Sequence, residues 1–458
     1  MDKELMTREE YWDYLRDLLK ERRYLKLRHE LVDDNEVDIA NFIEELHEDE
    51  AAVVFRMLPK QLGAEVFAHL EPSSQRNLAK AFSDREVADM LDKLFVDDAV
   101  DFLEEMPASV VKRLLAITDS EKRQLINHFL QYPEDSAGSI MTAEFTDLKK
   151  NMTVGQAIEH LRKHGEDRET IYTCYVTNAQ RILEGVVSVK ALLLADDDEL
   201  IGDLMETDIV KANTLDDQEN VANLFHTYDF LAIPVVDNEN RLVGIVTVDD
   251  AVDIMQEEVT EDFEKMAAMM PSERPYLKTS TFSHAKSRIP WLLILMISAM
   301  VNGHILERYE QAFVALPALV FFIPMLTDTG GNVGSQTSTM MIRGMTLREI
   351  GFGDIFRVLW KETRVSMIMG LVLAVINFIR IYISYDFTIA MTVSVALFVT
   401  VFMSAAIGGI LPLVASRLKL DPAIMAAPLI TTIVDAGALV IYFATAHLLL
   451  STFGVPGV

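Results

Sequence analysis

A single carboxylate interrupts the last apolar segment of the sequence. The stretch "TTIVDAGALVIYF", residues 431–443, places Asp435 well inside a run that is long enough to cross a bilayer. An acidic residue at the centre of a membrane helix costs about 2.5 to 3.5 kcal/mol on insertion scales, so it needs water, an ion or a polar partner. We therefore expect Asp435 to be a functional residue. The alternative is a structural carboxylate that is hydrogen-bonded between helices.

A second polar stretch lies earlier in the apolar half, in "IPMLTDTGGNVGSQTSTMMIRG", residues 323–344. Its glycines, among them Gly331, predict a break in a membrane helix, and the free carbonyl groups of such a break must face protein or water. Asn332 and Gln336 are one helical turn apart and would line the break with polar groups. The alternatives are an ordinary helix end followed by a turn, or close helix packing on small residues.

Both stretches belong to apolar segments that predict five membrane-spanning helices. The segments lie near residues 290–306, 312–327, 365–384, 389–415 and 424–450. Most are long enough to cross about 30 Å of hydrocarbon. Lysine and arginine are concentrated before the first segment and after the second and fourth, which predicts a cytoplasmic amino terminus and an external carboxyl terminus. Five helices would wall a pore thinly, so we expect a homodimer whose two-fold axis brings equal residues face to face.

Acidic residues are concentrated in the first part of the chain. Residues 1–285 carry 61 acids against 30 bases, a net charge of −31, whereas the remainder carries 9 acids and 11 bases. This charge would repel nucleic acid and attract polyvalent cations. We therefore predict a soluble acidic part joined to a membrane part, with cations and no nucleic acid as partners. The single cysteine, Cys174, allows no intrachain disulfide and suits a reducing compartment.

The acidic part begins with a helical repeat. Residues 40–59 and 88–107 align without a gap at an offset of 48, and a weaker copy lies halfway between them. Apolar residues at spacings of three and four predict short helix pairs that stack into a superhelix. We expect residues 36–135 to form this all-α scaffold and residues 1–35 to form an added amphipathic arm.

A second duplication follows, because "SIMTAEFTDLKKNMTVGQAIEHL" resembles "DLMETDIVKANTLDDQENVANLF". Each copy predicts a helix, two β-branched strands around a turn, and a second helix. The copies, residues 136–200 and 201–256, resemble a pair of CBS domains, an α+β sensor module that is often dimeric and frequently binds adenine nucleotides. The second copy keeps "GIVTVDD", whose Thr247 and Asp250 would contact a ribose, whereas the first has Ala191 in place of the acid. We expect at most one site per chain for ATP or another adenine nucleotide; Asp250 could equally serve a metal.

An acidic helix connects this pair to the apolar half. The stretch "VDDAVDIMQEEVTEDFEKMAAM" has an apolar stripe at helical spacing, and acids cover its other faces. We assign the connecting helix to residues 250–283. Its carboxylates would repel one another unless cations lay between them. The alternative is a solvated linker helix.

The order of these parts resembles the MgtE family of magnesium channels and transporters over nearly the whole length. The stretches "TGGNVGSQ", "LDPA" and "TTIVDAGALVIYF" carry the resemblance in the apolar half. It implies a multi-domain chain: an all-α helical-repeat N domain, an α+β CBS pair, and an α-helical membrane domain of five transmembrane helices at residues 284–458. It also implies a homodimeric Mg²⁺-selective channel in the plasma (inner) membrane, in contact with lipid, which cytosolic Mg²⁺ closes.

The resemblance assigns roles to individual residues. The pore aspartate of the family corresponds to Asp435, and Asn332, Gly331 and Thr431 also face the ion. Regulatory Mg²⁺ would bind at Glu65, Asp98, Asp217, Glu219, Asp229, Asp250, Asp253, Glu258, Glu261, Asp262 and Asp421. Three positions depart from the family pattern: Asp328, to which no role can be transferred, Gln256 and Ser335.

Other functions are compatible with parts of this pattern. A secondary transporter could exchange a divalent cation for protons or sodium, with Asp435 as a titrating relay. A membrane-tethered nucleotide sensor would need the apolar half only as an anchor. We expect no histidine-based metal site and find no nucleophile beside a base, so an enzyme is the least expected class.

Overall fold

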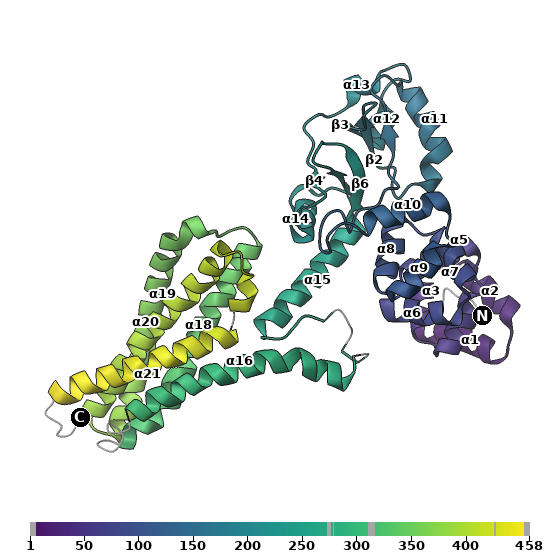
Figure 1. The fold of residues 1–458 in the computed structure, drawn as a ribbon. Helices are drawn as coiled ribbons and strands as arrows, with labels where there is room; N and C mark the ends of the chain where they lie inside the picture. Colours follow the sequence, from purple (N-terminus) through teal and green to yellow (C-terminus); the bar gives the residue numbers. More distant parts are fainter. Residues whose placement is uncertain (1–5, 273–275, 278, 310–316, 426, 453–458) are drawn as a thin grey trace. The chain divides into compact units, whose positions relative to one another are not determined.

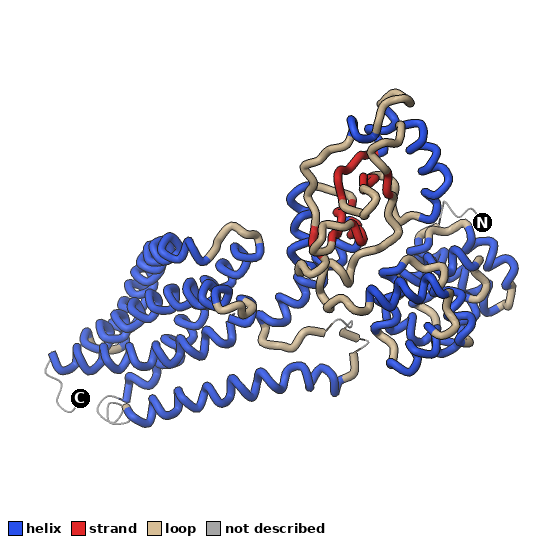
Figure 2. Tube along the Cα trace, turned by 45° about the horizontal axis from the view of Figure 1, so that its top comes forward, coloured by secondary structure: helices blue, strands red, loops and turns tan. Residues whose placement is uncertain are grey.

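The computed structural model describes the chain except for residues 1–5, 273–275, 278, 310–316, 426 and 453–458. The contacts divide the chain into two units, Met1–Met255 and Gln256–Val458. Strands lie in the first unit, whereas the described part of the second unit is helical (Figures 1 and 2).

Helices α1 to α10 form the first part of unit 1. Their bounds are α1 Arg8–Lys20, α2 Tyr24–Val32, α3 Glu36–Glu44, α4 Glu48–Phe55, α5 Lys60–Ala68, α6 Pro72–Ala81, α7 Asp84–Leu91, α8 Val96–Glu104, α9 Ala108–Leu115 and α10 Ser120–Phe129. Side-chain caps hold the starts of α1, α3, α7 and α10. At α7, for example, the Ser83 hydroxyl accepts from the backbone N–H of Glu86, and the Glu86 carboxylate accepts from the backbone N–H of Ser83.

The helices stack as the 24-residue period predicts. Each of α3, α4, α5, α7 and α8 packs on the helix two places further along the chain. Aromatic rings from successive repeats meet in the core, where Phe67 lies 6.0 Å from Phe55 and 5.1 Å from Phe102 between ring centroids. The helical repeat is therefore held by side chains that no single helix pair could bury alone.

The amino-terminal residues differ from the expected separate arm. Leu15 on α1 and Leu27 and Leu31 on α2 are buried in the same hydrophobic core as α3 to α10. The hydroxyl of Tyr11 also donates to Asp34 at 2.8 Å. Helices α1 and α2 therefore add one more helix pair to the scaffold, because their apolar faces need the next pair to cover them.

Two three-stranded sheets follow, with the same topology. Their elements are β1 Asp147–Leu148, α11 Val154–His164, β2 Thr173–Thr177, β3 Leu183–Ser188, α12 Val189–Leu194, α13 Ile201–Leu204, β4 Ala212–Asn213, α14 Gln218–Tyr228, β5 Ala232–Val236 and β6 Leu242–Thr247. In each sheet the first strand is parallel to the second, and the second is antiparallel to the third. The duplication in the sequence is thus a duplication of fold, and the CBS pair is confirmed.

The two copies exchange their leading segments. The backbone of Thr142, before β1 of the first copy, pairs with Ile245 on β6 of the second copy. In the same way Glu206, before β4 of the second copy, pairs with Val186 on β3 of the first. The pairing leaves no room for a side chain at Gly244, where an added Cβ would lie 2.7 Å from the sulfur of Met141. Each copy therefore completes the other, which makes the pair one folding unit.

The second unit contains the apolar helices. After α15 Val248–Met266, which crosses the unit boundary, the elements are α16 Thr281–Arg308, the 3-10 helix η3 Pro317–Phe322, α18 Ile323–Thr346, η4 Phe352–Asp354, α19 Ile355–Ser384, α20 Phe387–Arg417, η5 Pro422–Met425 and α21 Ala427–Thr452. Helix α20 packs against α18, α19 and α21, while α16 packs against α21 (Figure 1). The connecting helix ends at Met266, well before the predicted residue 283.

Four helices in the described residues are long and apolar enough to cross a bilayer. They are Thr281–Arg308, Phe352–Ser384, Phe387–Arg417 and Pro428–Leu449. Helix α18 is not among them, because it carries polar and glycine residues along its length. Part of the segment predicted at 312–327 lies outside the described residues, and the helix that follows begins at Ile323.

The predicted helix break at the glycines is wrong. Residues 323–346 form one continuous α-helix through Gly330, Gly331 and Asn332. The glycines instead allow close packing: an added Cβ would lie 2.9 Å from Thr431 Cγ2 at Gly331 and 2.7 Å from Ile430 Cγ2 at Gly334. Small residues at one face let α18 approach α20 and α21 with backbone contact, which was the alternative interpretation of these glycines.

This packing predicts an asymmetric response to adding one methyl group. A Cβ at Gly408 on α20 would lie 2.4 Å from the Gly334 carbonyl oxygen, whereas nothing lies within 4 Å of one at Gly303 on α16. We expect Gly408→Ala to destabilise the second unit by about 1 to 3 kcal/mol through overpacking. In thermal melting of the full chain in detergent, Gly408→Ala should have a lower Tm than the wild type. The control, Gly303→Ala, should have the wild-type Tm. Equal melting temperatures would contradict the close helix contact.

Candidate functional site

Asp435 lies half-buried on α21, within the packed helices of the second unit. Its helix neighbour Thr431 uses its hydroxyl within the helix, donating to the Pro428 carbonyl at 2.9 Å, and its methyl group meets Gly331 on α18. Gly331 is buried in this contact. The structure therefore brings together three of the four predicted pore positions, Asp435, Thr431 and Gly331, on the facing sides of α18 and α21.

The outer face of α18 is polar. Asn332 and Gln336 are exposed one turn apart, as their spacing predicts, and Asp328 is exposed one turn earlier on the same face. On the opposite face, Gly330, Gly331 and Gly334 are buried against α20 and α21. Asn332, the fourth predicted pore position, is thus on the exposed face of α18, together with Asp328, whose charge acts on Asp435.

Four carboxylates gather between the helical repeat and the CBS pair, and we call them the buried acid group: Asp97, Asp98, Glu169 and Asp250. Asp97 and Asp98 begin α8, Glu169 precedes β2, and Asp250 begins α15. The charges of Asp98, Asp250 and Glu169 act on Asp97, and the charge of Asp250 also acts on Asp98 and Glu169. The sequence prediction named Asp98 and Asp250 without linking them; the fold links them and adds Asp97 and Glu169.

Burial governs the protonation of this group. It raises the pKa of Asp98 to about 7 and that of Glu169 to about 8, with neighbouring carboxylates adding to the effect. Burial also raises the pKa of Asp250 to about 6, although a hydrogen bond from the Thr247 hydroxyl opposes the increase. Asp97 Oδ1 and Glu169 Oε2 are buried without a hydrogen-bond partner. The group is therefore short of positive charge.

One ammonium group lies near these acids. Lys122 on α10 contacts Glu144 at 3.2 Å, and its charge lowers the pKa of Asp98 against the larger effect of burial. Asp250 itself accepts a hydrogen bond from Thr247 Oγ1 at 2.5 Å. Thr247 and Asp250, the predicted ribose ligands, are thus in direct contact at the end of β6.

A second charged group, which we call the Lys265 group, lies in the second unit. The ammonium of Lys265 contacts Asp421 at 2.6 Å and Glu261 at 2.7 Å. Burial raises the pKa of the adjacent Asp262 to about 6, and the charge of Asp421 contributes. The fold therefore gathers three predicted regulatory acids around a lysine that the sequence prediction did not single out.

The remaining predicted regulatory acids are spread out. Asp217 caps the start of α14 and Asp229 ends it with φ of 54°, so the two lie about 18 Å apart at opposite ends of an eleven-residue helix. Glu219 lies in the first turn of α14. The other predicted regulatory acids are exposed or partly exposed. They are Glu65 on α5, which accepts a hydrogen bond from Gln61, and Asp253 and Glu258 on α15. One ion cannot bind both ends of α14.

No group of three or more His, Cys, Asp or Glu side chains is arranged to hold a metal within the described residues. Mg²⁺ keeps several of its waters and is commonly bound through one or two carboxylates, so the two acid groups suit a hydrated ion better than a dehydrated one. One histidine pair does have ligand spacing, contrary to the prediction: His160 and His164 on α11 have ring centroids 4.5 Å apart.

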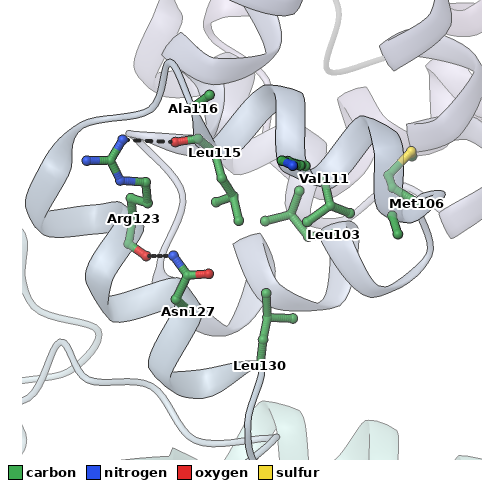
Figure 3. A pocket seen from close by; sticks show the side chains of 10 residues that line it. Leu103, Met106, Val111, Leu115, Ala116, Arg123, Asn127 and Leu130 are labelled. Atoms are coloured by element: carbon green, nitrogen blue, oxygen red, sulfur yellow. Dashed lines mark hydrogen bonds between the residues drawn. The ribbon is translucent and has the colours of Figure 1, made fainter.

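One pocket in the helical repeat has a lining of a different kind. It measures about 540 Å³ and lies between α8, α9 and α10 (Figure 3). Its lining is apolar, with Lys112 and Arg123 as its charged residues, and the Arg123 guanidinium donates to the Leu115 carbonyl at 3.4 Å. Basic and apolar walls do not suit a cation.

Known families match these same regions. Residues 34–135 match the MgtE intracellular N domain, residues 137–198 and 201–257 match the CBS domain, and residues 323–445 match MgtE, described as a divalent cation transporter. The magnesium transporter MgtE of Thermus thermophilus is 36% identical over 440 residues, which cover 95% of this chain and 98% of that protein. The magnesium transporter MgtE of Bacillus subtilis is 34% identical and covers 89% of this chain and 93% of its own.

Solved structures agree for the soluble part. The soluble part of a magnesium transporter is 32% identical, with a TM-score of 0.53, and covers 55% of this chain and 99% of its own. The cytosolic domain of the Mg²⁺ channel MgtE in complex with ATP is 36% identical, with a TM-score of 0.51. The match covers 52% of this chain and 98% of that structure. The two curated relatives are therefore matched over nearly their full length, and family models match the helical repeat, the CBS pair and the helical region. The chain belongs to the MgtE family, whose members are divalent cation transporters rather than enzymes.

Proposed function

We propose that the chain is a homodimeric Mg²⁺-selective channel for magnesium uptake. Each subunit would cross the plasma (inner) membrane five times. Four crossings would be the long apolar helices, and η3 with α18 would form the fifth, although α18 is less apolar than the other four. The soluble unit would be cytoplasmic and the carboxyl terminus external. Asp435 carries the proposal, because a half-buried carboxylate on α21 lies beside the polar face of α18 in the region that matches divalent cation transporters.

The energetics of such a pore are favourable. A two-fold axis would set one Asp435 from each subunit around one ion, so two carboxylates balance the charge of Mg²⁺. Water that the ion retains would fill the space between the carboxylates and the amides of Asn332. The membrane potential would drive entry with about 2.3 kcal/mol per charge per 100 mV, or roughly twice that for Mg²⁺.

The two acid groups support regulation by cytosolic Mg²⁺. In the buried acid group, Asp97, Asp98, Glu169 and Asp250 repel one another when ionised, and Mg²⁺ would draw the helical repeat and the CBS pair together. In the Lys265 group, Mg²⁺ would tie α15 to the loop that precedes α21. Mg²⁺ closes the pore only insofar as it binds the closed arrangement better than the open one.

An adenine nucleotide is a second ligand that the CBS pair could hold. The contact between Thr247 and Asp250 favours a ribose site in the second copy, and the cytosolic domain of a related channel was solved with ATP. Because Asp250 also belongs to the buried acid group, nucleotide and Mg²⁺ at this position would be coupled. We therefore propose that ATP alters the Mg²⁺ concentration at which the channel closes.

An exchanger is the rival function within the same family. In an exchanger, Asp435 would carry protons or sodium against a divalent cation. The reversal potential separates the two, because it follows the Mg²⁺ gradient alone in a channel and moves with pH or sodium in an exchanger.

Removing the pore carboxylate should abolish uptake. We expect Asp435→Ala to reduce Mg²⁺ uptake by magnesium-starved cells at least about tenfold, because one ion would lose both of its counter-charges. Glu349→Gln is the matched control, since Glu349 is exposed beyond the end of α18. Uptake by Asp435→Ala at the level of the control, with equal protein in the membrane, would reject the pore role.

The buried acid group predicts a pH-dependent stability. Its carboxyl pKa values are raised by folding, so its stabilising effect is complete below about pH 4 and is lost as the pH rises through about 6 to 8. We expect the melting temperature of unit 1 in the full chain, without Mg²⁺, to fall by several degrees between pH 6 and pH 8. Calorimetry should show a smaller fall with millimolar Mg²⁺ or in Glu169→Gln, and an unchanged fall in Glu166→Gln. A fall that Mg²⁺ leaves unaltered would contradict cation binding here.

The Lys265 group predicts competition between an ammonium and Mg²⁺. Removing the ammonium leaves Glu261, Asp262 and Asp421 without their counter-charge. We expect Lys265→Gln to lower the Mg²⁺ concentration that protects α15 from protease by about threefold or more. Lys286→Gln, which removes an exposed lysine from α16, should leave that concentration unchanged. A higher concentration for Lys265→Gln would mean that Lys265 assists binding of the ion.

A further inference from the structure

We propose that Asp328 is a second carboxylate of the ion path and sets its preference for divalent over monovalent cations. This inference rests on the proposed channel function. It concerns the residue for which the family pattern supplies no role, and it follows from the position of Asp328 on α18.

Asp328 continues a polar stripe. On a helix, residues four apart share a face, and Asp328, Asn332 and Gln336 are all exposed on this face of α18. The side of the helix that carries Gly330, Gly331 and Gly334 packs closely on α20 and α21. The subunit leaves the Asp328 face uncovered, and along three successive turns this face presents one carboxylate and two amides, followed by the exposed Met340.

The packing contacts place this stripe level with the middle of the apolar helix α20. An added Cβ at Gly330, two residues after Asp328, would lie 2.8 Å from Thr400 Cγ2, and Thr400 is near the middle of the apolar helix Phe387–Arg417. A polar side chain exposed at this depth meets hydrocarbon unless it faces water or protein, and a carboxylate there is costly. Water is the better match for three successive polar side chains.

The same contacts place Asp328 next to Asp435. Gly334 meets Ile430 on α21, and Gly330 meets Val434, so the two helices run antiparallel where they touch. Gly331 meets Thr431, and Asp328 lies one turn before Gly331 while Asp435 lies one turn after Thr431. This places Asp328 beside Asp435, and the charge of Asp328 acts on Asp435. Among the described residues, no basic side chain is found to offset that charge on Asp435.

Two adjacent carboxylates per subunit have a consequence for selectivity. In a homodimer, four carboxylates would surround the path near its middle, and their mutual repulsion would be relieved far better by a divalent ion than by a monovalent one. An ion that keeps its waters can bridge carboxylates on two helices without close ligand geometry. Asp328 would thus hold divalent cations at the level where Asp435 binds them.

The test measures block of monovalent current by Mg²⁺. The full chain in lipid bilayers should pass sodium when divalent cations are removed, and external Mg²⁺ should block that current. We expect Asp328→Asn to raise the half-blocking Mg²⁺ concentration by about threefold or more, with Asp328→Glu close to the wild-type value and Glu349→Gln unchanged. A half-blocking concentration equal to wild type in Asp328→Asn would overturn the inference.

A second measurement does not depend on conduction by the variant. The chain has one cysteine, Cys174, which is buried, so the wild type is a control for thiol labelling. We expect Asp328→Cys to react with a water-soluble, charged methanethiosulfonate reagent and Mg²⁺ to slow the reaction. Lack of reaction in the folded full chain would place residue 328 against lipid or protein and reject the proposal.

These outcomes separate the inference from the function on which it rests. If the wild type carries no current that Mg²⁺ blocks, the channel function fails whatever Asp328 does. If the wild type conducts and Asp435→Asn relieves block while Asp328→Asn does not, the channel function stands and only the role of Asp328 is lost.

Discussion

Negative charge held away from water, with too little positive charge beside it, is the constraint on which this structure depends. It occurs in the soluble unit, where Asp97 and Glu169 are buried with oxygens that lack partners, and in the helical unit, where Asp435 lies half-buried. Burial raises the free energy of the ionised form at each place. Under the proposed function, a bound divalent cation would relieve that cost and the cost would return when the ion leaves, so the same electrostatic effect would act in permeation and in regulation.

In the soluble unit, the buried carboxylates lie where the helical repeat contacts the CBS pair. Its helical repeat and CBS pair meet at the start of α8 and the start of α15, so the charge state of Asp98 and Asp250 acts on the contact between two rigid parts. Because each CBS copy is completed by the leading segment of the other, the pair resists internal rearrangement. Repulsion among these carboxylates therefore acts across the contact between the helical repeat and the CBS pair.

In the helical unit, small residues allow the helices to pack closely. Gly330, Gly331 and Gly334 remove side chains from one face of α18, and the backbone of α18 approaches α20 and α21. This close contact leaves the other face free for polar side chains at the depth where the apolar helices are packed. A bulkier inner face would push α18 outward and separate Asn332 from Asp435. The glycines therefore position the polar face, although they do not open the helix.

The sequence by itself determined the parts and their order. Periodicity predicted the stacked helix pairs, duplicated strand patterns predicted the CBS pair, and apolar length predicted the long helices α16, α19, α20 and α21, because each of these signals is local. It also identified Asp435, since a charge in an apolar run is visible without a fold. The helix break at Gly331 was wrong because glycine permits both a break and a close helix contact, and only the facing helices decide between them.

Only the tertiary structure decided which charges meet. Lys265 and Asp421 are 156 residues apart, and Asp98, Glu169 and Asp250 come from three separate elements, so no spacing rule relates them. Acidic residues are abundant throughout the first part of the chain, and most remain solvated. Burial selects the few whose ionisation costs free energy, and burial is a property of the packed chain. For the same reason Asp328 had no stated role until the packing of α18 placed it beside Asp435.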